Sequence, residues 1–238
     1  MKLRYFLALL ISDFLMYLLM LVIGFACMPF AIWSRKNAYA SIRFYCRSVF
    51  FVLKYVAGIT LEFKGKIPVE PCIICSKHQS FLDIMMLVSV VPDCRFIMKH
   101  QLVNLPVIGF YARQIGCVAV NRDKKMGTVT KMLEALKKEE SRQTIVYPQG
   151  TRVLPGEKKP YKMGAALIYR DLDLPCYLVA TNTGAFWARR SPYRYPGKAV
   201  IEFVDVIEKG MDVNVFIKVV EEKIEAASNL LMNNDRFK

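Results

Sequence analysis

The stretch SKHQSFLD, residues 76–83, holds residue types that could carry out acid–base chemistry. His78 is one of only two histidines in the chain, and Asp83 follows it five residues later. A loop histidine held in one tautomer by a carboxylate keeps its other ring nitrogen available to accept a proton. A structural interpretation competes, because Ser80 and Asp83 are spaced like a capping box ahead of an apolar helix. The sequence leaves open whether Asp83 orients the histidine or caps the helix.

The hydroxyl that such a base would deprotonate is more readily explained as part of a substrate than as part of the protein. Cys75, Ser76 and Ser80 lie nearby, but none is in a G-x-S-x-G elbow or another familiar nucleophile setting. We therefore expect His78 to act on a substrate hydroxyl, a role that typically contributes about 10²–10⁴ in rate.

A second segment with suitable chemistry is YPQGTR, residues 147–152, directly after an apolar run. Gly150 lets the backbone approach a ligand closely, and Arg152 can bind phosphate oxygens through two parallel hydrogen bonds. This pattern indicates an anion site. The alternative is an ordinary tight turn with an exposed arginine.

Two more cations come where strands are expected to end. Lys99 follows one short apolar run, and Arg122 ends the segment GCVAVNR, residues 116–122. Open α/β sheets bind ligands at the carboxyl ends of their strands. Together with Arg152, these side chains predict a phosphate pocket near His78.

The elements that must position these residues follow from the periodicity of the chain after about residue 58. Short apolar runs rich in Ile, Val, Phe and Tyr alternate with helical spacing, which predicts an α/β fold: a mixed, largely parallel sheet of about seven strands flanked by helices. The predicted strands are Ile59–Phe63, Cys72–Ser76, Arg95–Met98, Val118–Asn121, Thr144–Tyr147, Cys176–Ala180 and Ala199–Val204. Helices are predicted over 81–91, 126–140 and 212–231.

The N-terminal region, residues 1–57, is predicted to anchor the chain in a membrane, ahead of a catalytic domain over 58–238. From residue 5 to residue 33, Asp13 is the one charged residue in an apolar run. As a helix, this run is long enough to reach across a hydrocarbon core of about 30 Å. Basic residues flank both sides of this run, so both ends favour the cytoplasmic face. That favours a re-entrant or interfacial helical hairpin, broken near Gly24 or Pro29, over a single span. Residues 34–58 are predicted to form a second, amphipathic helix.

The overall charge agrees with a membrane-surface protein. Thirty-four Lys and Arg against 20 Asp and Glu give a net charge of +14, which attracts nucleic acid and anionic lipid alike. With an apolar segment on the same chain, anionic membrane lipid is the expected partner and nucleic acid is not.

The seven cysteines are odd in number and scattered, as expected of reduced, mostly buried thiols. Cys72, Cys75 and His78 have spacing that could suggest half of a metal site. Residues three apart on a strand point to opposite faces, however, so no metal site is expected here.

Four blocks in order resemble the glycerophospholipid acyltransferase family, and within it the bacterial 1-acyl-glycerol-3-phosphate acyltransferases. The blocks are H-x4-D at 78–83, GCVAVNR at 116–122, YPQGTR at 147–152 and LPCYLVATNTG at 174–184. The resemblance covers about residues 58–205. It implies transfer of an acyl group to the free 2-hydroxyl of 1-acyl-glycerol-3-phosphate (lysophosphatidic acid), giving phosphatidic acid for phospholipid biosynthesis at the cytoplasmic face of the inner membrane.

The resemblance also implies roles for individual residues. His78 would be the general base and Asp83 would orient it. The acyl group would arrive as a thioester on coenzyme A or acyl carrier protein as co-substrate, with no further cofactor, no metal and no covalent acyl-enzyme. The implied acceptor-binding residues are Lys99, Arg122, Gln149, Gly150, Thr151 and Arg152.

The chain departs from the family pattern at three positions. Lys77 stands where Asn or another small polar residue usually precedes the histidine, Gln149 replaces the glutamate of P-E-G, and Leu178 replaces a common proline. Glutamine keeps a donor and an acceptor but loses the charge. Two other readings therefore stay open: an acyltransferase for another acceptor, such as lyso-ornithine lipid or glycerol 3-phosphate, and a basic membrane-binding scaffold without catalysis.

Overall fold

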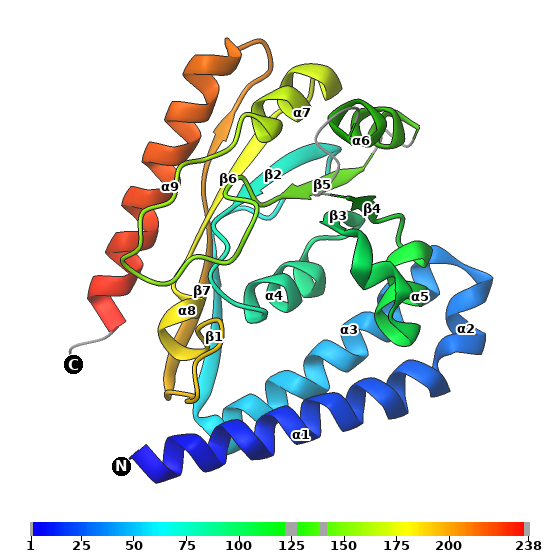
Figure 1. Cartoon of the computed structure of the whole chain (residues 1–238), viewed down its shortest axis with the longest axis vertical. Coiled ribbons are helices and arrows are strands. Elements are labelled where there is room, and N and C mark those ends of the chain that lie inside the picture. The colour runs from blue at the N-terminus through cyan, green and yellow to red at the C-terminus, as the bar shows by residue number, and fades with distance from the viewer. Residues whose placement is uncertain (1, 122–127, 139–141, 236–238) are drawn as a thin grey trace.

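The computed structural model describes residues 2–121, 128–138 and 142–235, which form one seven-stranded sheet with helices on both faces (Figure 1). The strand order is β1-β7-β6-β2-β5-β3-β4. The strands are β1 (Ile59–Lys64), β2 (Cys72–Ser76), β3 (Cys94–Lys99), β4 (Val118–Val120), β5 (Gln143–Val146), β6 (Cys176–Thr181) and β7 (Gly197–Ile207). The predicted mixed, largely parallel sheet is confirmed, and β7 is the strand whose ends differ most from the prediction.

Five of these strands run in one direction. The neighbours β6, β2, β5, β3 and β4 pair in parallel, whereas β7 is antiparallel to β6 and parallel to β1. The carboxyl ends of five strands therefore meet at one edge of the sheet, which we call the carboxyl edge. The opposite edge, where these strands begin, is the amino edge.

The central strand β2 shows why the sheet needs helices on both faces. All five of its residues are buried. Cys72 and Ile74 pack into one core, and Ile73 and Cys75 pack into the other. The two cysteines of the C-x-x-C therefore face opposite sides of the sheet, as alternation along a strand predicts.

Two groups of helices cover the two faces (Figure 1). One face packs against α3, α4 and α5, and the other packs against α6, α7 and α9. The helices of the catalytic region are α4 (Leu82–Val90), the 3₁₀ turn η2 (His100–Asn104), α5 (Pro106–Gln114), α6 (Thr128–Lys137), α7 (Gly164–Leu172), α8 (Thr183–Phe186) and α9 (Val213–Asp235). The predicted helices correspond to α4, α6 and α9.

The N-terminal region forms a helical hairpin, but its returning arm is the predicted second helix after the apolar run and not the end of that run. Helix α1 (Lys2–Ala26) leads through α2 (Met28–Trp33) into α3 (Arg35–Val52), which returns beside α1 and ends in the π-helical turn η1 (Leu53–Ala57) (Figure 1). The break lies at Cys27, between the two positions considered. Pro29 is in the first turn of α2, where its missing N–H costs nothing.

Gly24 does not break α1. It lies within the helix, where it allows close packing against α5. A Cβ at this position would lie 2.5 Å from Val107 Cγ1 of α5, so only glycine allows α1 and α5 to approach so closely. The Tyr111 hydroxyl of α5 donates to the Gly24 carbonyl at 3.0 Å. The hairpin is thus packed directly against the catalytic region.

The outer surface of α1 is apolar. Helix α1 from Leu3 to Ala26 is long and apolar enough to cross a membrane. Many of its large side chains are exposed, with Phe14 at 66% and Leu3 at 69%, whereas Ala8, Met16 and Ile23 face the protein. A contiguous exposed surface of this kind is typical of contact with a membrane or a partner.

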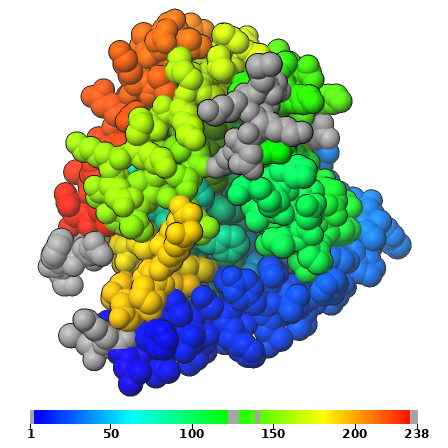
Figure 2. All heavy atoms as spheres, viewed as in Figure 1, coloured from blue at the N-terminus to red at the C-terminus, as the bar shows by residue number. Residues whose placement is uncertain are grey.

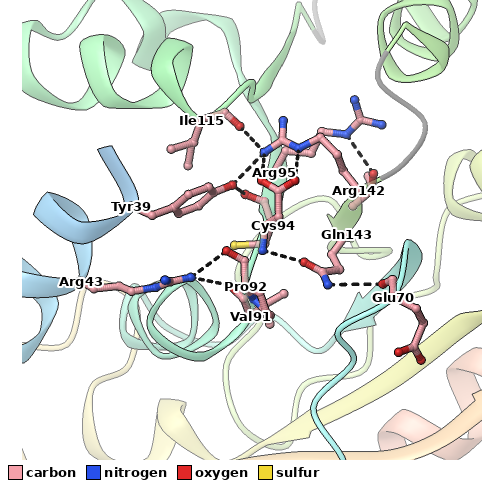
Figure 3. Close-up of polar contacts among 12 residues, drawn as sticks. Tyr39, Arg43, Glu70, Val91, Pro92, Cys94, Arg95, Ile115, Arg142 and Gln143 are labelled. Atoms are coloured by element: carbon pink, nitrogen blue, oxygen red, sulfur yellow. Dashed lines mark hydrogen bonds and ion pairs between the residues drawn. The ribbon is translucent and has the colours of Figure 1, made fainter. Parts of the chain in front are cut away.

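A hydrogen-bond network closes the amino edge of the sheet (Figure 3). Arg142 lies just before β5, and its side chain is only 3% exposed. It donates to both carboxylate oxygens of Asp93, to the Tyr39 hydroxyl of α3 and to the Ile115 carbonyl. Arg43 of α3 donates to the carbonyls of Val91 and Pro92. These contacts attach the hairpin to the strand ends opposite the carboxyl edge.

Candidate active site

His78 lies in the loop that follows β2, and Asp83 lies in the first turn of α4. The Nδ1 atom of His78 is 3.0 Å from Asp83 Oδ1. The histidine side chain is 13% exposed, whereas the aspartate is fully buried. With Asp83 ionised, Nδ1 carries the proton and Nε2 is the ring atom that can accept one. This is the geometry of an oriented general base.

The second carboxylate oxygen of Asp83 fixes the loop. Oδ2 accepts the backbone N–H groups of Gln79 and Ser80, both at 2.8 Å. The Ser80 hydroxyl accepts the N–H of Leu82 at 3.1 Å. Asp83 thus satisfies free amides ahead of α4 and orients His78 at the same time, because each function uses a different oxygen. The two readings of Asp83 left open by the sequence are compatible.

Tyr147 completes the support of the histidine, a role that the sequence analysis did not predict. Its ring stacks on the His78 ring with centroids 3.9 Å apart and planes 20° apart. Its hydroxyl donates to Asp83 Oδ1 at 3.3 Å. Burial, and next the Asp83 carboxylate, raise the pKa of Tyr147 well above its usual value, so the hydroxyl stays a donor.

The other blocks converge on the histidine loop. The backbone N–H of Val153 donates to the His78 carbonyl at 2.8 Å, which places the Arg152 segment directly beside the loop. The Gly184 N–H, after β6, donates to Gln79 Oε1 at 3.0 Å. Figure 2 shows teal atoms from the chain around β2 and α4 at the base of a hollow, between the gold segment after β6 and the green segment around α5.

The loop after β5 has the backbone that its glycine predicts. Gly150 has φ +68°, and a Cβ there would lie 3.2 Å from Lys162 Nζ. Its own N–H donates to the Tyr147 carbonyl at 2.8 Å, so this amide closes the turn. The half-buried Arg152 follows, and burial together with the positive charge of Arg189 lowers its pKa. An arginine remains charged at neutral pH despite such a shift.

Arg189 and Arg190 are functional candidates that the sequence analysis missed. Arg189 Nη1 donates to Thr151 Oγ1 at 3.1 Å, and both arginines are close enough to Arg152 to lower its pKa. They lie after α8, in a segment with no strand or helix to mark it. The R-R pair two residues after Trp187 was the available signal. We call Arg152, Arg189 and Arg190 the arginine cluster.

The remaining predicted residues are placed as follows. Lys99 is exposed at the carboxyl end of β3, two strands away from β2. Arg122 lies outside the described residues. The role of Gln149 in acceptor binding stays a prediction. Its side chain is 1% exposed and turned into the protein, where Nε2 donates to Glu225 Oε1 of α9 at 3.4 Å.

Lys77 is also turned toward α9, where it pairs with Glu225. A pocket of about 250 Å³ opens on this side of the loop and is lined by Lys77, Gln79, Glu225 and neighbouring residues of α9 and the 156–159 segment. Lys77 and Gln149, the two residues beside the site that depart from the family pattern, therefore both face α9.

The thiols do not gather into a metal centre. All seven cysteines are free, and five of them are buried. Within the described parts of the chain, no three His, Cys, Asp or Glu side chains are grouped so that they could hold a metal ion.

Comparison with known proteins agrees with this site. The sequence profile of the acyltransferase family matches residues 58–182, which is more than half of the chain. The chain belongs to the acyltransferase family. The match spans the histidine loop, the glycine loop and strand β6, whereas Gly184, the two arginines after α8 and Glu225 lie beyond it.

The relatives are 1-acyl-sn-glycerol-3-phosphate acyltransferases from several kingdoms. The enzyme of that name from Pseudomonas aeruginosa is 28% identical over 159 residues, 64% of this chain and 61% of the relative. That from Helicobacter pylori is 33% identical over 161 residues, 66% of each chain. The matches thus span less than two thirds of these relatives. The crystal structure of the 1-acyl-sn-glycerophosphate acyltransferase from Thermotoga maritima shares the fold, with a TM-score of 0.72, 21% identity and coverage of 93% of this chain and 96% of that one.

Proposed function

We propose that this chain is a membrane-bound acyltransferase that converts 1-acyl-glycerol-3-phosphate to phosphatidic acid. A fatty acyl group moves from an acyl thioester, on coenzyme A or acyl carrier protein, to the sn-2 hydroxyl of the acceptor. One observation carries the proposal: the oriented pair His78–Asp83 lies beside the loop of Arg152, against which Arg189 is hydrogen-bonded. The names of the relatives support this choice of acceptor.

In the proposed reaction, His78 Nε2 accepts the proton of the sn-2 hydroxyl as its oxygen attacks the thioester carbonyl. The new C–O bond forms, the C–S bond breaks, and the histidine returns the proton to the departing thiolate. Asp83 stabilises the imidazolium that exists in between, because its buried carboxylate already accepts from Nδ1 at 3.0 Å. The thioester is a co-substrate, and this route needs no resident cofactor.

The arginine cluster binds the phosphate of the acceptor in this proposal. Guanidinium groups make paired, charge-assisted hydrogen bonds with phosphate oxygens. No carboxylate of the described residues forms an ion pair with Arg152, Arg189 or Arg190, so their charge is available for a ligand. Two negative charges on the acceptor headgroup would relieve the repulsion among these side chains.

The hairpin supports a location at the membrane surface. Arg194, a few residues after Arg190, pairs with Asp13 of α1 at 2.6 Å and stacks over Trp187 at 4.3 Å. This contact places the segment of the arginine cluster next to the exposed apolar surface of α1. A lipid acceptor could therefore present its headgroup to the cluster while its acyl chain stays near the bilayer. The proposed site is the cytoplasmic face of the inner membrane, with anionic lipids as surroundings.

Gln149 offers no support for a different acceptor, because it is turned toward α9. Whether lyso-ornithine lipid or glycerol 3-phosphate is the acceptor would be decided by competing the acceptors in one reaction and identifying the products by mass spectrometry. A scaffold without catalysis would release thiol from the thioester equally with and without acceptor.

The decisive test is an assay of the purified protein in detergent with acyl thioester and lysophosphatidic acid. We expect acceptor-dependent thiol release by the wild type. His78→Ala should lower kcat by about 10²–10⁴, and Asp83→Asn should also lower it, because the tautomer is no longer fixed. Unimpaired turnover by His78→Ala would falsify the proposed base. Retained acceptor binding by this variant controls for folding.

A further inference from the structure

One carboxylate joins the loops on both sides of the candidate active site. Glu225 Oε1, on α9, accepts hydrogen bonds from Lys77 Nζ, from the Tyr161 hydroxyl at 3.0 Å and from Gln149 Nε2 at 3.4 Å. Lys77 immediately precedes His78, and Gln149 immediately precedes Gly150. The same oxygen atom therefore holds the residue before the candidate base and the residue before the acceptor loop.

The charge of Lys77 makes this contact important. Its side chain is 4% exposed, and a buried ammonium group is stable only with a counter-charge and hydrogen bonds. Among the described residues, the ion-pair partner of Lys77 is Glu225. The glutamate is 24% exposed and lines the pocket beside the loop.

Helix α9 is a firm base for this carboxylate. Phe216, Val220 and Ile224 are fully buried and pack into the core on the sheet face that α9 covers. Ile224 directly precedes Glu225, so the position of the carboxylate is fixed by core packing. The backbone of Lys77 is held independently, since its N–H donates to the Val179 carbonyl at 3.0 Å.

The two departures beside the site meet at this glutamate. The family pattern has a small polar residue at position 77 and a carboxylate at position 149. Here a cation occupies the first position and a neutral amide the second, and both contact Glu225. A carboxylate is thus present beside the end of the Gln149 side chain, contributed by a residue 76 positions further along the chain.

We propose that Glu225 is a positioning residue for acyl transfer, which holds the loops of His78 and Gly150 in register through Lys77 and Gln149. It takes the place of the carboxylate that related proteins have at position 149. The inference rests on the proposed function only in that His78 is the base. A shift of about 1 Å in the base can cost on the order of 100-fold in rate.

The first experiment compares Glu225→Gln with the double variant Gln149→Glu/Glu225→Gln in the acyl-transfer assay. Glutamine keeps the shape of residue 225 but leaves Lys77 without a counter-charge, so we expect kcat to fall about 10- to 100-fold. The double variant returns a carboxylate to the other side of the same contact and should recover most of the loss. Glu222→Gln, an exposed glutamate of the same helix, is the matched control and should behave as wild type.

A second measurement does not depend on activity. The chain has two histidines, so the ring signals of His78 and His100 can be separated by NMR with labelled histidine, using His78→Ala for assignment. Glu225→Gln should move the His78 signal and leave His100 in place, and the double variant should return the signal toward its original position. A general loss of folding would move both signals.

Three results would overturn the inference. The first is a Glu225→Gln variant with the kcat and His78 signal of the Glu222→Gln control. The second is a loss of kcat that follows only the folded fraction, measured by thermal melting. The third is a loss that the double variant fails to restore. An inactive wild type would instead contradict the proposed function, and the His78 signal would still decide the role of Glu225.

Discussion

The two edges of the sheet use arginines in opposite ways. At the amino edge, the buried Arg142 donates from Nε and Nη2 to both oxygens of Asp93, to the Tyr39 hydroxyl and to the Ile115 carbonyl (Figure 3). At the carboxyl edge, Arg152, Arg189 and Arg190 lie near one another, and no carboxylate of the described residues forms an ion pair with them. The first arrangement is complete within the protein. In the proposed function, the second is completed by the phosphate of the acceptor.

On the proposed function, this difference separates residues that stabilise the fold from residues that would bind substrate. A buried cation with all its donors satisfied contributes to stability, and its removal leaves unpaired partners. Several cations without counter-charges repel one another and reduce stability. Such a cluster is maintained where an anionic ligand compensates it. The comparison predicts that replacing an arginine by alanine has opposite effects on stability at the two edges.

The largest effect on stability is expected from Arg142→Ala. The Tyr39 hydroxyl, the Ile115 carbonyl and Asp93 would lose their donor, which should lower the free energy of unfolding by about 2–4 kcal/mol. Thermal melting in detergent measures the loss, and kcat per folded molecule should stay near the wild-type value. Arg170→Ala removes an exposed arginine and is the control, with a change within about 0.5 kcal/mol. A stable Arg142→Ala protein with impaired catalysis would break the comparison.

Arg152→Ala is expected to change the free energy of acceptor binding, by less than Arg142→Ala changes the free energy of unfolding. Loss of a charge-assisted contact of about 1.5–3 kcal/mol should raise the acceptor KM roughly 10- to 100-fold. The melting temperature should remain or rise, because one of three neighbouring like charges is gone. Arg189→Ala should act in the same direction. Unchanged acceptor KM and kcat in Arg152→Ala would refute the phosphate role.

The smallest effect is expected from Lys99→Ala. Lys99 is exposed at the end of β3, and exposed charges contribute about 0.2–1 kcal/mol. The acceptor KM should therefore rise less than about fivefold, measured in the same assay. A change as large as that of Arg152→Ala would show that the phosphate lies nearer to β3 than proposed, and would extend the cluster across the sheet.

The sheet could be predicted because its signals are local. Cys72–Ser76 and the other strands are short apolar runs, and burial on both faces requires that composition. Asp83 could also be predicted, since three of its hydrogen-bond partners lie within five residues. Helices α5 and α7 were not individually predicted, although they are as long as α4.

The parts that could not be predicted depend on contacts between distant segments. Arg189 contacts a residue 38 positions away, and Glu225 contacts one 148 positions away. The stacking of Tyr147 on His78 likewise joins two strands that are adjacent only in the folded sheet. No local pattern encodes such pairs. For the same reason, Gln149 could be recognised as a departure while its orientation toward α9 could not.

Asp13, the only charge in the apolar run of α1, has a consequence for how the protein sits in lipid. Because its carboxylate is joined to Arg194, α1 cannot rotate about its own axis without breaking an ion pair with a nearly buried partner. With α1 as the proposed membrane anchor, the face that meets the hydrocarbon would be set by the rest of the fold, and the tilt of the protein on the bilayer would follow from it. A generic hydrophobic helix put in place of α1 would still hold the protein at the membrane, but it would let the entrance to the site turn away from the lipid headgroups.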